Sequence, residues 1–375
     1  MAQAAEGHYE DHYADRNLQG MAITRYGHAL PTRTIEVVEA GHPVPDEAGV
    51  TATLRALDSL RGLDPDDLLL CLISGGASAL LCAPHGVTLE QKAELTRTLL
   101  ASGATISEIN CVRKHLSRVK GGRLAAATSA SVVGLIVSDV VGDDLASIGS
   151  GPTAPDPTTF AEALEILDRY GVAAGAAYSH LEAGKSGAHR ETPKPRDPLF
   201  DRVDNRLVAG NQQSLEAAAA VIGKHGLTPH VLSSTVEGEA REVARVHAAI
   251  VRQVRQHGQP FARPCALISG GETTVTVRGS GRGGRNSEFL LALAIELCDL
   301  PGVYALAADT DGIDGSEDNA GAIYDVAAFH RVQVAEARRL LANNDSYTFF
   351  ERAERLFTTG PTRTNVNDLR IVIIE

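Results

Sequence analysis

The chain of 375 residues contains no tryptophan, and aromatic residues make up only 4% of the sequence. Surfaces that bind single-stranded nucleic acid by base stacking need aromatic side chains, so the composition argues against this class of protein. Positive charge is also scarce, because 35 Lys and Arg stand against 47 Asp and Glu, a formal net charge of −12. This balance argues against nonspecific binding to DNA or to anionic membranes.

Segments that would direct the chain into or across a membrane are also missing. The sequence has no run of 18 apolar residues, and its N-terminus lacks the basic and then apolar pattern of a secretory signal. Its five cysteines are scattered and form no C-x-x-C pair, which is typical of free thiols in a reducing compartment. We therefore expect a cytoplasmic globular protein, and the chain length favours two domains over one.

Several common catalytic signatures are absent as well. The sequence contains no Walker A loop, no H-R-D or D-F-G set, no H-E-x-x-H zinc motif and no G-x-S-x-G nucleophile elbow. What it does contain are glycine turns, acidic clusters and arginine clusters. Phosphoryl transfer needs anion-binding groups and a metal ion rather than a nucleophilic side chain, so this combination favours that class of reaction.

Strands and helices alternate along the sequence, which predicts an α/β fold with a doubly wound, Rossmann-like parallel sheet. Apolar strands are expected within 67–76 and 131–144, and helices within 46–63, 88–103, 107–127 (with a glycine break) and 158–172. The proline-rich stretch 191–202 has no periodicity and is expected to be a linker or surface loop.

The five letters LISGG occur twice, at Leu72–Gly76 and Leu267–Gly271. We interpret each copy as a junction between a strand and a turn. Open α/β sheets bind ligands at the carboxyl ends of their strands, so functional groups are expected near such junctions.

A glycine loop, GSGRGGRNSEFLL, occupies residues 279–291. Gly279, Gly281 and Gly284 satisfy the dinucleotide fingerprint G-x-G-x-x-G. Asp309 follows Gly284 by 25 residues, close to the spacing of the acid that binds the ribose of a nicotinamide cofactor. A dehydrogenase is therefore one hypothesis.

Two features of this loop argue against a dinucleotide. The preceding strand, 272–277, alternates polar and apolar residues, whereas a central parallel strand is usually apolar throughout. Arg282 and Arg285 lie inside the loop, and arginine side chains suit a terminal phosphate or a carboxylate, which they bind in a bidentate manner. From the motif alone, a solvated turn, an anion site and a dinucleotide site all stay open.

Two other segments are candidates for anion binding. The turn SGGASALL at 74–81 follows an apolar strand, and its backbone N–H groups could face an anion, although a tight turn also explains its glycines. The segment 111–123 concentrates six basic residues, which a solvated helix face would also explain. In a chain of net charge −12, this cluster beside a Gly-Gly pair is nevertheless a candidate for an anion pocket.

Acidic residues gather at the ends of two expected strands. Asp139, Asp143 and Asp144 follow one strand, and Asp309, Asp311 and Asp314 follow another, although turn-forming aspartates are the simpler interpretation. Carboxylates clustered in this way are costly unless they meet a cation, and Mg²⁺ bound with nucleotide phosphates is one solution.

Six ordered motifs then resemble one family over nearly the whole chain. They are LISGGASALL, NCVRKHLSRVKGGRLA, SDVVGDDLASIGSGPT, LISGGETTVTVRGSGRGGRNSE, AADTDGIDG and TTGPTRTNVNDLRI. Together they are similar to the class II (MOFRL-type) glycerate 2-kinase family. The resemblance implies ATP-dependent phosphorylation of D-glycerate to 2-phosphoglycerate, and a homodimer is one assembly it allows.

The resemblance also implies a domain organisation and a set of site residues. We expect a Rossmann-like glycerate kinase domain at 1–200 and a MOFRL α/β domain with its linker at 201–375, with the active site in the cleft between them. Arg285 and Arg282 are the expected catalytic residues, with Arg285 favoured, and Asp139, Asp309 and Asp311 the expected Mg²⁺ ligands. The expected substrate and ATP ligands are Ser74, Gly75, Gly76, Ser78, Asn110, Arg113, Lys114, Gly270, Gly271, Glu272 and Asn286.

The beginning of the chain departs from the family pattern. Family members normally begin about fifty residues earlier, with a helix, a strand and a turn that carries a catalytic lysine. Here the opening residues, MAQAAEGHYE, resemble the middle of the helix that follows that turn. We therefore expect an upstream segment to be missing from this sequence. The rival functions are a hydroxypyruvate reductase that uses NAD(P)H and a truncated protein that binds ligand without turnover.

Overall fold

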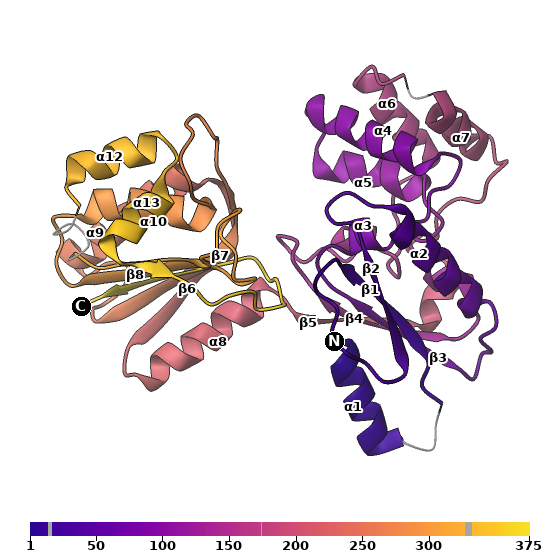
Figure 1. Ribbon diagram of the computed structural model, residues 1–375, viewed down its shortest axis with the longest axis horizontal. Coiled ribbons are helices and arrows are strands. Elements are labelled where there is room, and N and C mark those ends of the chain that lie inside the picture. The colour runs from indigo at the N-terminus through magenta and orange to yellow at the C-terminus, as the bar shows by residue number, and fades with distance from the viewer. Residues whose placement is uncertain (14–16, 174, 327–331) are drawn as a thin grey trace. The chain divides into compact units, whose positions relative to one another are not determined.

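The computed structural model describes residues 1–13, 17–173, 175–326 and 332–375, which fold into two compact units (Figure 1). Unit 1 consists of Met1–Ile136 and Asp144–Val208, and unit 2 of Val137–Asp143 and Ala209–Glu375. Both units combine helices with β-strands, so the expected α/β class is confirmed. Position 200, the expected domain boundary, lies inside the short 3₁₀ helix η3.

Unit 1 carries the first five strands and seven helices of the chain. Its strands are β1 (Gly20–Arg25), β2 (Ile35–Ala40), β3 (Leu68–Ile73), β4 (Ser131–Val137) and β5 (Val203–Ala209), of which the last residues of β4 and β5 fall in unit 2. Its helices are α1 (Ala2–Tyr13), α2 (Glu47–Leu60), α3 (Ala77–Leu80), α4 (Leu89–Ala101), α5 (Ile106–His115), α6 (Phe160–Arg169) and α7 (Gly175–Lys185), with 3₁₀ turns η1 (Ala125–Ala127), η2 (Ile148–Ser150) and η3 (Pro198–Arg202).

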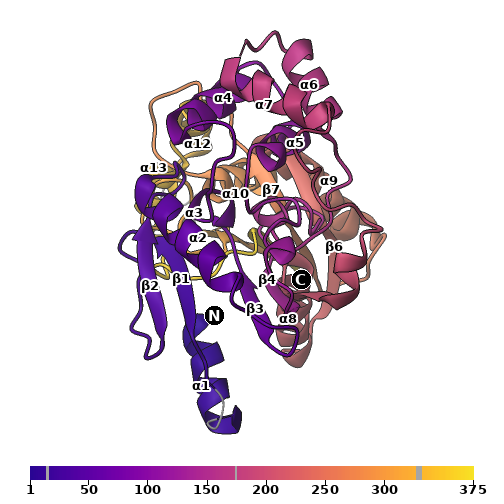
Figure 2. The same ribbon diagram turned by 90° about the vertical axis from the view of Figure 1, so that its right-hand side faces the viewer.

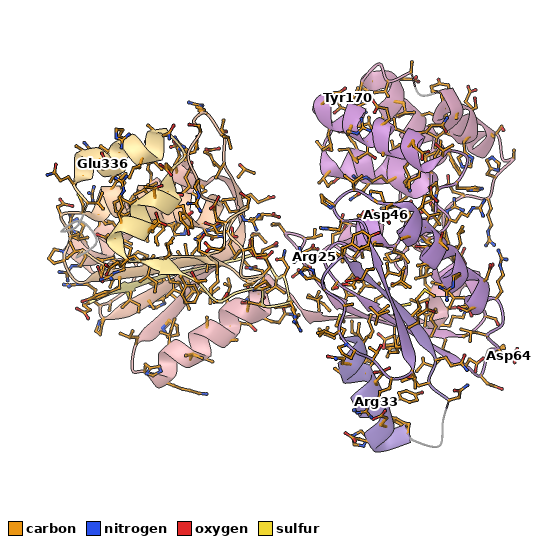
Figure 3. The ribbon with its side chains drawn as sticks, viewed as in Figure 1. Arg25, Arg33, Asp46, Asp64, Tyr170 and Glu336 are labelled. Atoms are coloured by element: carbon orange, nitrogen blue, oxygen red, sulfur yellow. The ribbon has the colours of Figure 1, made fainter. Side chains whose placement is uncertain are left out.

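Side-chain caps set where the helices of unit 1 begin. Thr88, Thr105 and Thr159 each form a capping box with the residue three positions later, so α4, α5 and α6 begin where two backbone donors are satisfied. Asp46, labelled in Figure 3, accepts a hydrogen bond from the backbone N–H of Gly49 and caps α2. The apolar faces of α4, α5, α6 and α7 then pack into one buried cluster.

The strands of unit 1 form two small sheets rather than one. β1 and β2 are parallel, with Gly20 opposite Ile35, and β3 and β4 are parallel, with Leu68 opposite Ser131. β5 lies on the other side of β4. Figure 2 shows β2, β1, β3 and β4 following one another across the unit. The parallel strands are as expected, but β1 and β3 do not pair, so the expected single sheet is interrupted between them.

Unit 2 contains one mixed sheet of six strands in the order β10-β9-β8-β11-β7-β6. The strands are β6 (Thr228–Glu239), β7 (Cys265–Thr274), β8 (Val303–Asp309), β9 (Gly321–Tyr324), β10 (Leu356–Phe357) and β11 (Asp368–Ile374). The helices are α8 (Asn211–Lys224), α9 (Ala240–His257), α10 (Arg285–Leu297), α12 (Val334–Ala342) and α13 (Ser346–Ala353). β11 is antiparallel to both of its neighbours, β7 and β8. Its first residue, Asp368, therefore lies opposite Gly271 of β7 and Asp309 of β8, which are distant from it in sequence.

The core of unit 2 forms around α10. Eleven of its thirteen residues are buried, and they pack against α9 and the sheet. Such complete burial fixes the helix, and therefore its first residue, Arg285, relative to the strand ends. No helix in the described parts of the chain is long and apolar enough to cross a membrane.

Two local expectations are wrong. The helix expected across 107–127 ends at His115, and the chain then turns through Gly121 and Gly122, both with positive φ, before η1. The second LISGG copy does not end a strand, because β7 continues to Thr274 and residues 275–277 lie outside it. Gly271 has φ +106°, and a Cβ there would lie 2.3 Å from the backbone N of Val236 in β6, so the glycine permits an irregular strand pairing rather than a turn.

Candidate active site

Arg285 is enclosed by three carboxylates at the first turn of α10. Its Nε donates to Asp368 at 2.8 Å, its Nη1 to Glu272 at 2.6 Å and its Nη2 to Asp309 at 2.7 Å. These acids come from the ends of three adjacent strands: β11, β7 and β8. We call the four side chains the arginine cage. It brings together Arg285, Glu272 and Asp309, which the sequence had suggested separately.

The hub of the cage is Asp368, a residue that the sequence reasoning missed. Its side chain is fully buried, and its Oδ1 also accepts a hydrogen bond from Asn286 Nδ2 at 2.8 Å. Its Oδ2 accepts from Arg370, also fully buried, and from the backbone N–H of Thr273 at 3.4 Å. The available signal was the pair of opposite charges, two residues apart, in the otherwise apolar strand DLRIVII.

Burial and neighbouring charges shift the pKa values of Arg285 and Asp309 in the arginine cage. Burial alone lowers the pKa of Arg285, but the Asp368, Asp309 and Glu272 carboxylates hold it above its ordinary value. Burial, reinforced by the negative charges of Asp311 and Asp368, raises the pKa of Asp309 to about 7, although Arg285 opposes the shift. The guanidinium therefore remains charged, while burial disfavours the charged form of the Asp309 carboxyl.

The N-terminus of α10 already holds an anionic group from the protein itself. Asp314, fully buried, accepts hydrogen bonds from the backbone N–H groups of Asn286 at 2.9 Å and Ser287 at 2.8 Å. In a Rossmann dinucleotide site, the pyrophosphate occupies this position. The Asp314 carboxylate therefore stands where a nicotinamide cofactor would need its phosphates.

The glycines of the 279–284 loop serve contacts within the protein. A Cβ at Gly279 would lie 2.3 Å from the backbone oxygen of Asn343, and one at Gly281 would lie 2.3 Å from Asp345. A Cβ at Gly284 would lie 2.3 Å from the Asp314 carboxylate. The loop thus requires glycine because it packs against its own chain, and the dinucleotide interpretation is not favoured.

Arg282 does not join the cage. Its Nη2 pairs with Glu317 at 2.6 Å, and its guanidinium stacks over the ring of Tyr347 at 4.0 Å from the centroid. The side chain is more than half exposed. The two arginines of the loop are therefore in different environments, and Arg285 alone is enclosed by acids.

The expected metal ligands fall in two places. Asp309 ends β8, and its Oδ1 accepts from the backbone N–H of Asp311 at 3.2 Å. Asp139 follows β4, and burial raises its pKa. Within the described ranges, no group of three or more His, Cys, Asp and Glu side chains is arranged to hold a metal. Mg²⁺ usually takes one or two carboxylates together with substrate phosphates, so Asp309 and Asp311 suit that mode of binding.

In unit 1, the turn at 74–81 that is expected to bind an anion is hydrogen-bonded to a second glycine turn at 149–151. Ser78 Oγ lies 2.9 Å from Ser150 Oγ, and Ser150 Oγ donates to Asn110 Oδ1 at 3.3 Å. Ser150 has φ +62° and stands between Gly149 and Gly151, which also have positive φ. Strained non-glycine residues of this kind cluster at functional sites, because the surrounding structure must support them. The structure thus brings the expected ligands Ser78 and Asn110 together.

The basic residues of 111–123 are not equivalent. Lys114 pairs with Asp156 at 3.2 Å, and both side chains are buried. Lys120, which the sequence placed in the basic cluster but not among the expected ligands, is buried and donates to the backbone oxygens of Ser78 at 2.8 Å and Gly149 at 3.2 Å. Burial, with Lys92 and Arg113 nearby, holds the pKa of Lys120 well below its usual value. Lys120 therefore supports the structure of this turn, whereas the described partner of Lys114 is the buried Asp156.

Two family models match the chain. Residues 1–182 match the Domain of unknown function (DUF4147), and residues 265–368 match the MOFRL family. A Thermotoga maritima protein named D-glycerate 2-kinase is 42% identical over 361 residues, which cover 95% of this chain and 84% of that protein. The chain belongs to the MOFRL-type glycerate 2-kinase family.

Other relatives of the chain carry two different names. A crystal structure titled glycerate kinase, from Thermotoga maritima, matches with a TM-score of 0.91 at 41% identity and covers 100% of this chain and 88% of that chain. An Agrobacterium vitis protein provisionally named a hydroxypyruvate reductase is 49% identical over 369 residues, covering 96% of this chain and 82% of that protein. The occupied N-terminus of α10 argues against carrying that reductase name over to this chain.

Proposed function

We propose that this chain phosphorylates D-glycerate at its 2-hydroxyl with ATP and Mg²⁺. The observation that carries the proposal is the arginine cage, in which a permanently charged guanidinium is held at the ends of three strands. Phosphoryl transfer requires cationic groups placed where negative charge builds up on the transferred group. The names of the glycerate kinase relatives support the choice of glycerate as the acceptor.

Within unit 2, each cage residue has a separate task in this proposal. The terminal nitrogen Nη1 of Arg285 meets an oxygen of the transferred phosphoryl group, while its Nε stays on Asp368. Asp309 and Asp311 hold Mg²⁺, which offsets charge on the nucleotide phosphates. The Asn286 side chain, bound to Asp368, fixes the start of α10 beside the reacting groups.

Within unit 1, the turn Ser74–Ser78 and the side chain of Arg113 are proposed to bind anionic oxygens of glycerate or ATP. Arg113 is partly buried, and burial lowers its pKa. A guanidinium in such a position gains more from an incoming anion than one in full contact with water. Gly76 has φ +84°, so its backbone can adopt a turn that other residues rarely take.

The first test measures the reaction itself. We expect the purified protein to form ADP from ATP only when D-glycerate and Mg²⁺ are both present, because the cage provides charge stabilisation and the chain carries no nucleophile motif. A coupled ADP assay measures this, and NADH absorbance with hydroxypyruvate is the control reaction. Oxidation of NADH without consumption of ATP would overturn the proposal.

We also propose that a further N-terminal segment completes the sheet of unit 1. The support is the strand order, since β2-β1 and β3-β4-β5 form separate sheets in which β1 and β3 do not pair. One parallel strand between β1 and β3 would unite them into the doubly wound order of Rossmann-like sheets. The turn after such a strand would carry the lysine that the family pattern places there.

A further inference from the structure

The three acids that surround Arg285 differ sharply in how firmly they are held. The Asp368 side chain is 0% exposed, that of Asp309 is 8% exposed and that of Glu272 is 44% exposed. All three bind the same guanidinium at distances between 2.6 and 2.8 Å. Distance alone therefore does not distinguish them, but burial does.

Asp368 is fixed by contacts that do not involve Arg285. Asn286, Arg370 and the backbone of Thr273 all donate to its two oxygens. Its backbone is also locked, because Asp368 is paired with Gly271 of β7 on one side and with Asp309 of β8 on the other. Removing a carboxylate with four donors would leave buried donors without partners, so this contact persists when a ligand arrives.

Glu272 is held much less firmly. Its contact with Arg285 Nη1 is its one described side-chain interaction, and almost half of the side chain faces solvent. Exposed ion pairs of this kind contribute little to stability. A phosphoryl oxygen, which carries more charge, can take the place of the Glu272 carboxylate on Nη1 at small cost.

We propose that Asp368 is the permanent positioning residue for Arg285, and that Glu272 is an exchangeable counter-ion that substrate phosphate displaces. Before substrate binds, Glu272 neutralises Nη1 and keeps the guanidinium extended towards the strand ends. When phosphate binds, Nη1 is released to it, while the Asp368 bond to Nε prevents the side chain from following the ligand. The proposal rests on the proposed kinase function. It assigns opposite roles to two acids that bind one arginine, since Asp368 holds Arg285 in place for phosphate and Glu272 competes with phosphate for it.

The exchange is tested with inorganic phosphate as the probe, by titration calorimetry on the full chain without glycerate. We expect Glu272→Gln to bind phosphate about two- to fivefold more tightly than the unaltered protein, because an exposed competing ion pair is lost. In an Arg285→Ala background the same substitution should change nothing. Unchanged or weaker binding by Glu272→Gln would overturn the exchange. Glu242→Gln, which breaks an exposed pair with Arg245 on α9, is the matched control.

The positioning role is tested by steady-state kinetics. We expect Asp368→Asn to lower kcat by about 10²-fold while the KM for ATP changes less than about threefold, since a misplaced arginine affects mainly the transition state. In the Arg285→Ala background, Asp368→Asn should cause no more than about a twofold further loss. A second full loss in that background would show that Asp368 does not act through Arg285.

The phosphate titrations and the kinetic measurements also distinguish a failure of this proposal from a failure of the proposed kinase function. If the unaltered protein consumes no ATP with glycerate, the kinase proposal fails, but the phosphate titrations still decide whether Glu272 competes for Arg285. If Asp368→Asn does not fold, the Glu272→Gln titration remains decisive, because almost half of that side chain faces solvent. Thermal midpoints of all variants show which case applies.

Discussion

Arg285 is the side chain on which the proposed chemistry most depends. If its Nη1 meets charge that grows only in the transition state, Arg285→Ala should lower kcat on the order of 10³-fold and weaken ATP binding far less. Arg285→Lys should recover only part of the loss, because a point charge cannot bind three acceptors in one plane. Steady-state kinetics measure both variants, with Arg245→Ala on α9 as an exposed control. A loss of tenfold or less would make Arg285 an ordinary structural arginine.

A second residue with a predictable effect is Asp314. Its carboxylate accepts two backbone hydrogen bonds at the start of α10, a helix that is buried almost throughout. Asp314→Ala leaves those two donors without partners, so we expect it to lower the free energy of unfolding by about 1 to 3 kcal/mol. Urea denaturation measures this loss. Asp345→Ala, at the partly buried N-cap of α13, where the side chain makes no capping hydrogen bond, should cost less, and an equal loss would argue against the capping role of Asp314.

Among the residues of the site, those named correctly from the sequence carry local signals. Arg285 and Asp309 stand in a glycine loop and at the end of an apolar strand, where functional groups of α/β proteins are expected. Asp368 begins a strand that looks like an ordinary core strand. Its role arises because β11 lies between β7 and β8, and this pairing joins positions about 60 and 100 residues apart, which no local pattern encodes.

At the scale of elements, we expect His85, which lies in a cluster of three histidine rings, to make the stability of unit 1 sensitive to acid. The rings of His85 and His180 lie 4.5 Å apart between centroids, and those of His180 and His189 also lie 4.5 Å apart. Burial, together with the nearby positive groups His180, Arg123 and Arg118, lowers the pKa of His85 to about 4. The unfolded chain therefore binds a proton near pH 6.5 that the folded chain does not bind until about pH 4.

The sign of the effect follows from this difference in bound protons. Stability should fall as the pH decreases from about 6.5 to about 4, since the unfolded state gains the proton first. We expect His85→Phe, which keeps a ring but cannot titrate, to flatten this part of the stability curve. Thermal midpoints at half-unit pH steps measure the slope. An identical slope in the variant would show that other groups cause the sensitivity.

The elements themselves were largely predictable because their signals are local. α4 and α6 begin at threonines whose capping boxes can be read from the sequence, and their apolar spacing sets the buried face. The second LISGG copy was not predictable in the same way. Whether Gly271 turns or continues a strand depends on β6, whose Val236 lies 35 residues earlier and approaches its backbone closely.

At the scale of the whole molecule, the lack of pairing between β1 and β3 among the described residues has a consequence for solubility. Unpaired strand edges recruit other chains, so we expect the purified 375-residue protein to be poorly soluble. Soluble yield measures this. A high soluble yield would show that these edges do not recruit other chains.

The carboxylate of Asp314 at the start of α10 has a wider meaning for how such sequences are named. A fingerprint of three glycines records only that something approaches the backbone closely, and here the neighbours belong to the same chain, among them the Asp314 carboxylate thirty positions downstream of Gly284. A chain with such an internal acid carries its own substitute for a cofactor phosphate. Glycine spacing by itself therefore does not separate a nicotinamide enzyme from a protein whose helix N-terminus is occupied by one of its own carboxylates.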